Sequence, residues 1–322
     1  MEQVIIIGAG PCGLSAASEL KEKGIEPLII EKGSIVDSIY RYPTFLQFHS
    51  TPELLEIGGI PFVTPNEKPT RLEGLTYYRT VAERKELRIR LYERVLAIRP
   101  EDGGFELDSE DRYGRKHTYR AKHVIVATGY FDQPNCLQVP GEELPHVSHY
   151  FQEAHPYAKM KVAVVGGNNS AVDAALELER VGAKVTVIYR GSELSPYVKA
   201  WVRPLFESAV NKGKIRMLFS SQITEIGEGF IMVESEGEVS RLENDFVLAL
   251  TGFRPDRQLL QACGVELDEE TGAPRHNPET METNVPNLFI AGVIAAGSRA
   301  NEIFIENGRF HGRSIAQAII ER

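Results

Sequence analysis

The segment "VIIIGAGPCGLSAASELKEKGIEPLIIEK", residues 4–32, indicates the fold class. Its first apolar run predicts a buried strand, and the glycine-rich turn "GAGPCG" follows at residues 8–13. The next segment has helical spacing and ends at Gly24, and a second apolar run predicts another strand. Two strands joined through a helix lie parallel in one sheet, because a parallel pair needs a long crossover connection. The sequence therefore predicts an α/β fold.

The first glycine turn has the pattern of a dinucleotide-binding turn. Gly8, Gly10 and Gly13 fit G-x-G-x-x-G. The first glycine permits the tight turn, the second lets the backbone approach a pyrophosphate, and the third lets helix and strand pack closely. The helix that follows offers N–H donors and the positive end of its dipole. Glu31 ends the second strand, 23 residues after Gly8, where a carboxylate can bind a ribose hydroxyl.

Residues 161–190 repeat the order of strand, glycine turn, helix and strand. The second turn, which we expect to contact another nucleotide, consists of Gly166, Gly167, Asn168, Asn169, Ser170 and Ala171. It fits G-x-G-x-x-A except at its second glycine position, where the side chain of Asn168 would crowd a pyrophosphate unless it turned away. Asn tolerates an unusual φ better than most residues.

The ribose-binding acid is missing from the second unit. Tyr189 occupies the place at which the first unit has Glu31, and Arg190 follows it. A guanidinium can pair with a 2′-phosphate, which a carboxylate would repel. Arg190 therefore predicts NADPH rather than NADH. Lys199 and Arg203 either assist this contact or belong to a solvated basic face, which is the reading we favour.

Two buried apolar strands mark the crossings between two domains. Each ends in Thr-Gly, the first at Thr128 and Gly129 and the second at residues 251–252. We interpret these as the points where the chain passes between domains. The prediction is two Rossmann-like domains, the second inserted into the first: residues 1–130 with 253–322, and residues 131–252.

Composition and charge exclude several functions. The chain has 322 residues and a net charge of −9, which argues against a general role in binding nucleic acids. No apolar run approaches the roughly 20 residues of a membrane span. The N-terminus lacks the features of a signal peptide. Cys12, Cys136 and Cys263 form no C-x-x-C pair, so we expect no disulfide framework, no metal site and a reducing cytoplasm. A homo-oligomer is also expected.

Two dinucleotide turns, an inserted domain and paired Thr-Gly junctions together resemble the flavoproteins with two dinucleotide-binding domains. The resemblance covers the whole chain and implies FAD at the first turn and a nicotinamide nucleotide at the second. The short length is similar to the thioredoxin-reductase-like branch. Two departures stand out: no C-x-x-C precedes the second turn, and Val293 occupies the place of an Asp that contacts the flavin ribityl chain.

A set of motifs more closely resembles the bacillithiol disulfide reductase family. The segments are "GAGPCG", "FHSTPELLEIGGIPF", "ATGYFDQPN", "GGNNSAVDAALEL" and "IAGVIAAG" followed by "NEIFIENGRFHG". The resemblance implies an FAD-dependent and NADPH-dependent enzyme with a small-molecule disulfide as its substrate. It also implies that Cys12, within the first glycine turn, is the redox residue. The further flavin contacts that it implies are Ser50, Thr51, Thr128, Gly129, Gly292, and the run Asn301, Glu302 to Gly308.

Two candidate catalytic residues lie near the expected flavin. We expect the first helical turn to favour the thiolate of Cys12, because helix N-termini lower the pKa of cysteine. A bound pyrophosphate at the same turn would oppose that effect. His49 could supply a proton to a leaving thiolate, although a structural role in its aromatic-rich loop is the simpler reading. Cys136 and Cys263 are expected to be incidental.

Three other functions remain open from the sequence. A ferredoxin-type or quinone-type NADPH reductase would need no thiol, which suits the missing C-x-x-C. A flavin monooxygenase is suggested by "VPGEELPHVSHY", which loosely resembles the F-x-G-x3-H-x3-Y fingerprint but has Val139 for Phe and one extra residue before His146. A non-catalytic NADPH sensor would use the two sites only for binding.

Overall fold

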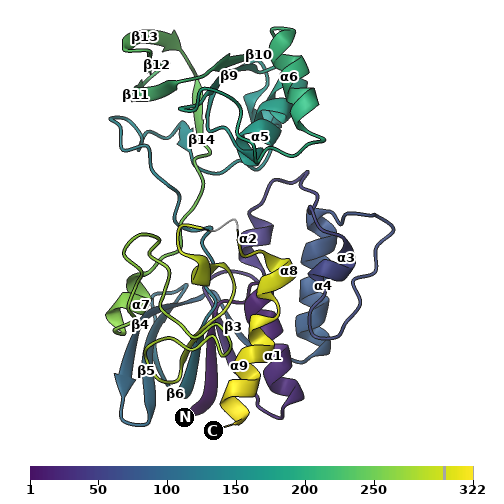
Figure 1. The fold of residues 1–322 in the computed structure, drawn as a ribbon, viewed down its shortest axis with the longest axis vertical. Helices are drawn as coiled ribbons and strands as arrows, with labels where there is room; N and C mark the ends of the chain where they lie inside the picture. The colour runs from purple at the N-terminus through teal and green to yellow at the C-terminus, as the bar shows by residue number, and fades with distance from the viewer. Residues whose placement is uncertain (300–301, 322) are drawn as a thin grey trace. The chain divides into compact units, whose positions relative to one another are not determined.

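The computed structural model describes residues 1–299 and 302–321. The chain divides into two units, one of Met1–Gln133 with Phe253–Arg322 and one of Pro134–Gly252 (Figure 1). The two connecting segments lie side by side where the chain enters and leaves the second unit. The backbone N–H of Asn135 donates to the oxygen of Gly252 over 2.9 Å. The hydroxyl of Thr251 donates to the oxygen of Asn135 over 2.5 Å.

The first unit is built on a seven-stranded sheet with the order β3-β2-β1-β6-β5-β4, and β15 also pairs with β6. Neighbouring strands among β3, β2, β1, β6 and β15 are parallel, whereas β4, β5 and β6 pair antiparallel. The strands are β1 Glu2–Ile7, β2 Leu28–Glu31, β3 Arg88–Leu91, β4 Glu93–Glu101, β5 Gly104–Asp111, β6 Lys116–Val126 and β15 Leu288–Ile290.

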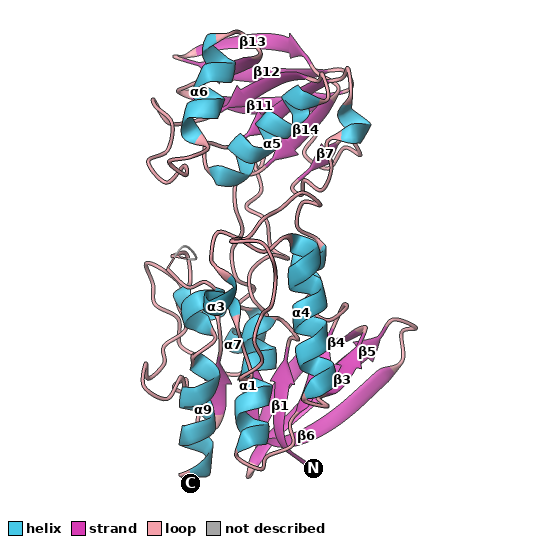
Figure 2. Cartoon of the chain, turned by 90° about the vertical axis from the view of Figure 1, so that its right-hand side faces the viewer, coloured by secondary structure: helices cyan, strands magenta, loops and turns pink. Residues whose placement is uncertain are grey.

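The first unit also contains helices, which Figure 2 draws beside and beyond this sheet. They are α1 Pro11–Glu22, α2 Asp37–Tyr40, α3 Pro52–Leu55, α4 Arg71–Arg84, α7 Gln258–Ala262, the 3-10 turn η2 Val293–Ala296, α8 Ile305–Gly308 and α9 His311–Ile320. Helix α1 packs closely on α9, where a Cβ on Gly312 would lie 2.5 Å from Cα of Ala16. A capping box between Thr70 and Glu73 starts α4.

The second unit repeats the parallel architecture in a five-stranded sheet, β10-β9-β8-β14-β7, and adds a three-stranded antiparallel sheet, β11-β12-β13. The strands are β7 Val147–Ser148, β8 Lys161–Val165, β9 Lys184–Ile188, β10 Ile215–Leu218, β11 Ser221–Gly227, β12 Phe230–Ser235, β13 Glu238–Glu243 and β14 Phe246–Ala249. The helices are α5 Asn169–Arg180 and α6 Arg203–Asn211, with a 3-10 turn, η1, at His155–Tyr157.

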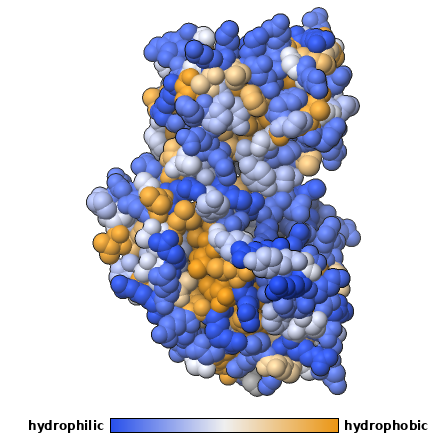
Figure 3. Space-filling view, turned by 180° about the vertical axis from the view of Figure 1, so that it is seen from behind, coloured by the Kyte–Doolittle hydropathy of each residue, from blue (hydrophilic) through white to orange (hydrophobic). Residues whose placement is uncertain are grey.

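Burial follows the apolar runs that the sequence analysis identified. Val4, Ile5 and Ile6 of β1 and Ile29 of β2 are fully inaccessible to solvent. Burying one such side chain contributes about 1.5–3 kcal/mol, so the central parallel strands hold the first unit together. The side of the molecule drawn in Figure 3 is mainly hydrophilic, and on this side the first unit carries an apolar area. Among the described helices, none has both the length and the apolar character needed to cross a bilayer.

Candidate functional site

The candidate site of the first unit lies where four chain segments leave the carboxyl ends of parallel strands. The amide of Gly8 donates to Ile30 over 2.9 Å, and the amide of Ala127 donates to Ile7 over 2.8 Å. The amide of Ala291 donates to Val126 over 3.0 Å. The turn after β1, the end of β2, the Thr-Gly segment after β6 and the segment after β15 therefore meet at one edge. Ligands of open α/β sheets bind outside this edge.

The three glycines of the first turn have three different surroundings. Gly8 has a φ of +108°, and a Cβ there would lie 2.5 Å from the oxygen of Ala127. A Cβ on Gly13 would lie 2.1 Å from the oxygen of Gly8. At Gly10 nothing lies within 4 Å of a Cβ. The missing side chain of Gly10 therefore leaves open space before the first turn of α1, where the sequence predicts a pyrophosphate.

Glu31 lies beneath the glycine turn. It is 7% exposed. Its Oε2 accepts the amide of Ala9 over 2.7 Å and its Oε1 accepts the amide of Gly33 over 2.8 Å. Burial raises the pKa of the carboxyl, and the two amide donors oppose this effect. A carboxylate offers about four lone-pair positions, so the two amides leave room for a ribose hydroxyl. That contact stays a prediction.

Cys12 is half-buried and packs beside two other predicted flavin contacts. A Cβ on Gly292 would lie 2.9 Å from its Sγ, and a Cβ on Gly308 would lie 3.0 Å from it. Two glycines thus make the space that the sulfur fills. Burial raises the pKa of the Cys12 thiol to about 12. This direction is opposite to the thiolate expected at the helix N-terminus, and its cause is the loss of solvent around the sulfur.

The segment with Ser50 and Thr51 meets the segment that starts α8. The Ser50 hydroxyl donates to the carboxylate of Glu306. The Arg309 guanidinium donates to the carbonyls of Glu53 and Glu56 over 2.9 and 2.6 Å. Thr51 is the N-cap residue of α3. The structure therefore brings together two segments that lie far apart in the sequence. Both were predicted to contact a flavin.

The remaining predicted residues of the first unit lie around these segments. His49 precedes the buried Ser50 and is itself exposed, as is Glu302, whose carbonyl accepts the side-chain amide of Asn307 over 2.8 Å. Half-buried Thr128 and Gly129 follow β6, and Gly129 has a φ of +69°. Asn301 lies outside the described residues.

His311 is a residue that the sequence reasoning missed. It begins α9, and its Nδ1 accepts the amide of Gly292 over 3.1 Å. Burial lowers its pKa, and His276 lowers it further. Burial thus favours the neutral ring, whose Nδ1 can accept the Gly292 amide. The quoted motif "NGRFHG" contains this histidine, but only the fold brings it to Gly292.

The second glycine turn also has its own surroundings. Gly166 has a φ of +143°, and a Cβ there would lie 2.6 Å from the oxygen of Leu250. A Cβ on Gly167 would lie 2.5 Å from the ring of Tyr189, so this ring covers part of the turn. Asn168 has an ordinary extended backbone, with a φ of −102°, and is exposed. Its position in the turn therefore needs no unusual φ.

Of the other residues of the second turn, two have structural roles and one is exposed to solvent. Asn169 holds the neighbouring loop, because its side chain donates to Tyr197 and accepts the amide of Lys199, each over 3.0 Å. Ala171 is fully buried, whereas Ser170 is exposed in the first turn of α5. The side-chain amide of Asn169 therefore forms its hydrogen bonds within the protein itself.

Arg190 and its basic neighbours differ in their partners. Arg190 is exposed after β9, and within the described residues no acid pairs with it. Lys199 pairs with Asp173 over 3.2 Å and its side chain is only 11% exposed. Arg203 donates to the carbonyls of Leu194 and Ser195. The expectation of a solvated basic face is therefore wrong for Lys199, whereas the Arg203 side chain is 35% exposed and also pairs with Glu207 over 3.5 Å. Within the described residues, Arg190 is the guanidinium beside the turn that has no acidic partner.

The comparisons with known proteins agree with one another on the family. Residues 5–292 match the family model described as pyridine nucleotide-disulphide oxidoreductase. The chain is 53% identical over 323 residues to bacilliredoxin reductase Bdr of Bacillus subtilis (strain 168), covering 100% of this chain and 98% of that protein.

Two solved structures are similar over their whole length. Bacillithiol disulfide reductase Bdr from Bacillus cereus is 53% identical, with a TM-score of 0.98 and coverage of 100% of this chain and 99% of that one. The protein of the same name from Staphylococcus aureus is 47% identical, with a TM-score of 0.95 and coverage of 99% and 98%. The predicted fold class, with two Rossmann-like domains, is confirmed by these matches.

Two glycine variants separate the fold from the nucleotide site. Gly13→Ala places a methyl group against the oxygen of Gly8, and we expect the free energy of unfolding to fall by about 1–3 kcal/mol. Gly10→Ala meets no protein atom, so the stability of the flavin-free protein stays near that of flavin-free wild type, but the methyl group occupies the open space and bound flavin is lost. Urea unfolding and visible absorbance measure the two effects. Full flavin content in Gly10→Ala would contradict the assignment.

Arg190→Ala tests nucleotide recognition. We expect the preference for NADPH over NADH, as a ratio of kcat/KM values, to fall by roughly 10-fold to 100-fold, because a charge-assisted hydrogen bond contributes about 1.5–3 kcal/mol. Arg216→Ala is the matched control, since Arg216 is another exposed arginine of the second unit. An unchanged ratio in Arg190→Ala would contradict the expected contact between Arg190 and the 2′-phosphate.

The histidine at the start of α9 predicts a pH dependence. Its pKa in the folded protein lies below its ordinary value of 6.5. The unfolded chain therefore binds more protons near and below that pH, and stability falls as pH decreases through the folded-state pKa. We expect His311→Gln to lose this part of the dependence, because Gln can accept the Gly292 amide without titrating. Denaturant unfolding across this range measures it, and identical pH slopes in both proteins would refute the prediction.

Proposed function

This chain belongs to the pyridine nucleotide-disulphide oxidoreductase family, and we propose that it is an NADPH-dependent flavoenzyme that reduces bacillithiol disulfide. The observation that carries the proposal is the pair of glycine turns, one in each unit, each at the carboxyl end of a parallel strand. Relatives that are 53% and 47% identical over nearly their whole length are named for this disulfide. The three free cysteines support a cytoplasmic location.

Residues of the first unit would hold different parts of FAD. The open space at Gly10 and the amides at the start of α1 would hold the pyrophosphate, and Glu31 would bind the ribose. The segments around Ser50, Gly292 and α8 would surround the rest of the cofactor, together with the Thr128–Gly129 segment. When bound, the flavin supplies the transfer of two electrons between a nicotinamide and a disulfide.

The second unit would bind NADPH. The amides at the start of α5 would face the pyrophosphate, and Arg190 would pair with the 2′-phosphate. Its exposure and its lack of a described acidic partner support this role. The ring of Tyr189 lies over Gly167, so it would line the same turn. Arg190 is therefore the residue that selects the nucleotide in this proposal.

Residues around the first site would supply protons during reduction of the disulfide. His49 is exposed and directly precedes Ser50 in its loop. From there it can donate a proton to a leaving thiolate. Cys12 is the thiol nearest to the flavin segments among the described cysteines, but its raised pKa makes it a weak nucleophile at neutral pH. The packing of its sulfur favours a structural role for Cys12 over the covalent step implied by the resemblance.

Cys12→Ala separates these two roles. We expect NADPH-dependent disulfide reduction to stay within about 3-fold of wild type, whereas removal of a nucleophile lowers kcat by several orders of magnitude. Cys263→Ala, which removes another cysteine from the first unit, is the control. Steady-state rates with bacillithiol disulfide measure the effect. A loss of more than about 100-fold, with flavin content and fold intact, would restore Cys12 as the catalytic thiol.

The function itself is tested by NADPH consumption across a panel of acceptors. Bacillithiol disulfide should be reduced faster than glutathione disulfide or cystine, and thiol product should form in a ratio of two per NADPH. Faster turnover with ferredoxin or a quinone, or oxygenated product with no disulfide present, would overturn the proposal. No turnover with any acceptor would instead support the sensor.

A further inference from the structure

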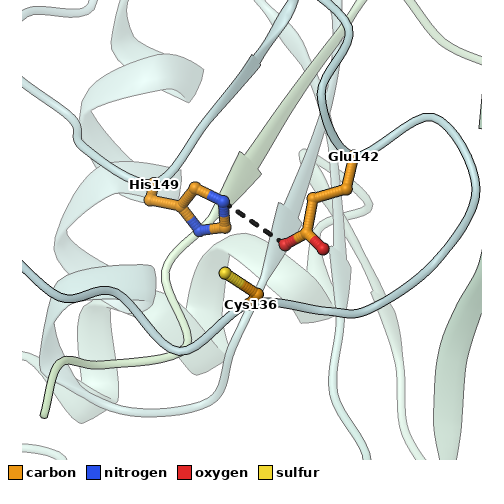
Figure 4. Close-up of side chains that lie close together, drawn as sticks. All are labelled: Cys136, Glu142 and His149. Carbon is orange, nitrogen blue, oxygen red and sulfur yellow. Dashed lines mark ion pairs between the residues drawn. The ribbon is translucent and has the colours of Figure 1, made fainter.

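Three possible metal ligands of different chemical types meet in the second unit (Figure 4). Cys136, Glu142 and His149 each offer one ligand atom, and these atoms lie within 4.8 Å of one another. The Nε2 of His149 lies 3.3 Å from Oε1 of Glu142. Figure 4 shows the sulfur of Cys136 directed toward the same space as the ring and the carboxylate.

The loop that carries Glu142 is fixed before any ligand binds. Oε1 of Glu142 accepts the amide of Leu137 over 2.6 Å, and its Oε2 accepts the amide of Gln138 over 2.7 Å. The loop is also attached to β11, because the amide of Ile226 donates to the carbonyl of Pro140 over 2.9 Å. Ligating carboxylates are commonly held by such additional hydrogen bonds.

The segment that carries His149 is fixed as well. Its preceding strand, β7, pairs with β14 in the parallel sheet. The hydroxyl of Ser148 donates to the carbonyl of Tyr150 over 2.8 Å and accepts the amide of Tyr150 over 3.1 Å, so the backbone turns tightly around the histidine. The ligands thus come from two anchored segments of one unit. Little ordering remains to be done when an ion binds.

The imidazole of His149 lacks one partner. Its side chain is 17% exposed, and Nδ1 is buried without a hydrogen-bond partner. A buried polar atom left without a partner is unfavourable. Since Nε2 already faces Glu142, the ring has one more polar atom than the described surroundings satisfy. A cation within the cluster would take one ring nitrogen as a ligand and leave the other to be a donor.

We propose that Cys136, Glu142 and His149 form a binding site for Zn²⁺. Thiolate, imidazole and carboxylate are the ligands that Zn²⁺ takes in proteins, whereas Mg²⁺ and Ca²⁺ prefer oxygen ligands alone. A thiolate and a carboxylate balance the two charges of the ion, and the thiol releases its proton on binding. Exposed Cys136 leaves the fourth position facing solvent, where water completes a tetrahedron.

This proposal revises an expectation drawn from the sequence. The absence of a C-x-x-C pair argued against a metal site, but only for a site made of paired cysteines. Here a single cysteine is combined with a carboxylate and a histidine. The site goes beyond the proposed reductase activity and needs neither nucleotide nor flavin.

Zinc binding by the flavin-containing full chain tests the proposal. After chelator treatment and dialysis against Zn²⁺, we expect one tightly held ion per chain by elemental analysis. X-ray absorption should show one Zn–S distance of about 2.3 Å with nitrogen and oxygen ligands. Cys136→Ser should weaken binding by at least about 10-fold, and so should Glu142→Gln and His149→Gln. Zn²⁺ should raise the melting temperature of wild type but not of Cys136→Ser.

Two matched controls and two adverse outcomes complete the design. Cys263→Ser removes a cysteine of the first unit, and His155→Gln removes an exposed histidine of the second, so both should bind Zn²⁺ as wild type does. Exposed Cys136 can be replaced without disturbing the core, which keeps the test independent of folding. Equal binding by Cys136→Ser and wild type would overturn the proposal. A reactive Cys136 thiol in a chain that retains no Zn²⁺ would also overturn it.

Discussion

The close backbone contact between the first glycine turn and the end of β6 is the constraint on which the site depends. Gly8 lies against the carbonyl of Ala127, and Gly13 lies against Gly8 itself. These contacts bring the start of α1 down onto the carboxyl ends of β1 and β6. Any side chain at either position would lift the helix away from the sheet. At Gly10, between these two glycines, nothing lies within 4 Å of a Cβ.

Burial decides the chemistry of the ionisable groups around this turn. Glu31, Cys12 and His311 all lie near it, and burial shifts each pKa toward the neutral form. For Cys12 this direction is opposite to the one expected from the helix dipole. The thiol therefore resembles a small apolar side chain more than a poised nucleophile. The same surroundings keep His311 neutral and able to accept the amide of Gly292.

The sequence was informative where local geometry requires a particular residue type. Gly8, Gly13 and Gly166 could be predicted because no other residue fits the turn. It was less informative where the role depends on which distant segment lies opposite. Nothing near His311 in the chain shows that it meets Gly292, and nothing near Ser50 shows that it meets Glu306. Lys199 looked solvated because Asp173 belongs to another element, and the Cys136 cluster went unseen because its ligands do not follow a cysteine-pair spacing.

The pocket around the Cys12 sulfur has a consequence for how this region can vary. The sulfur occupies volume that exists only because Gly292 and Gly308 lack side chains. The three positions therefore behave as one steric unit. A larger residue at any one of these positions requires a smaller residue at another. No residue is smaller than glycine, so Gly292 and Gly308 cannot compensate in this way. Paired substitutions among these positions should consequently be strongly non-additive in stability, and their tolerance in related chains should be correlated rather than independent.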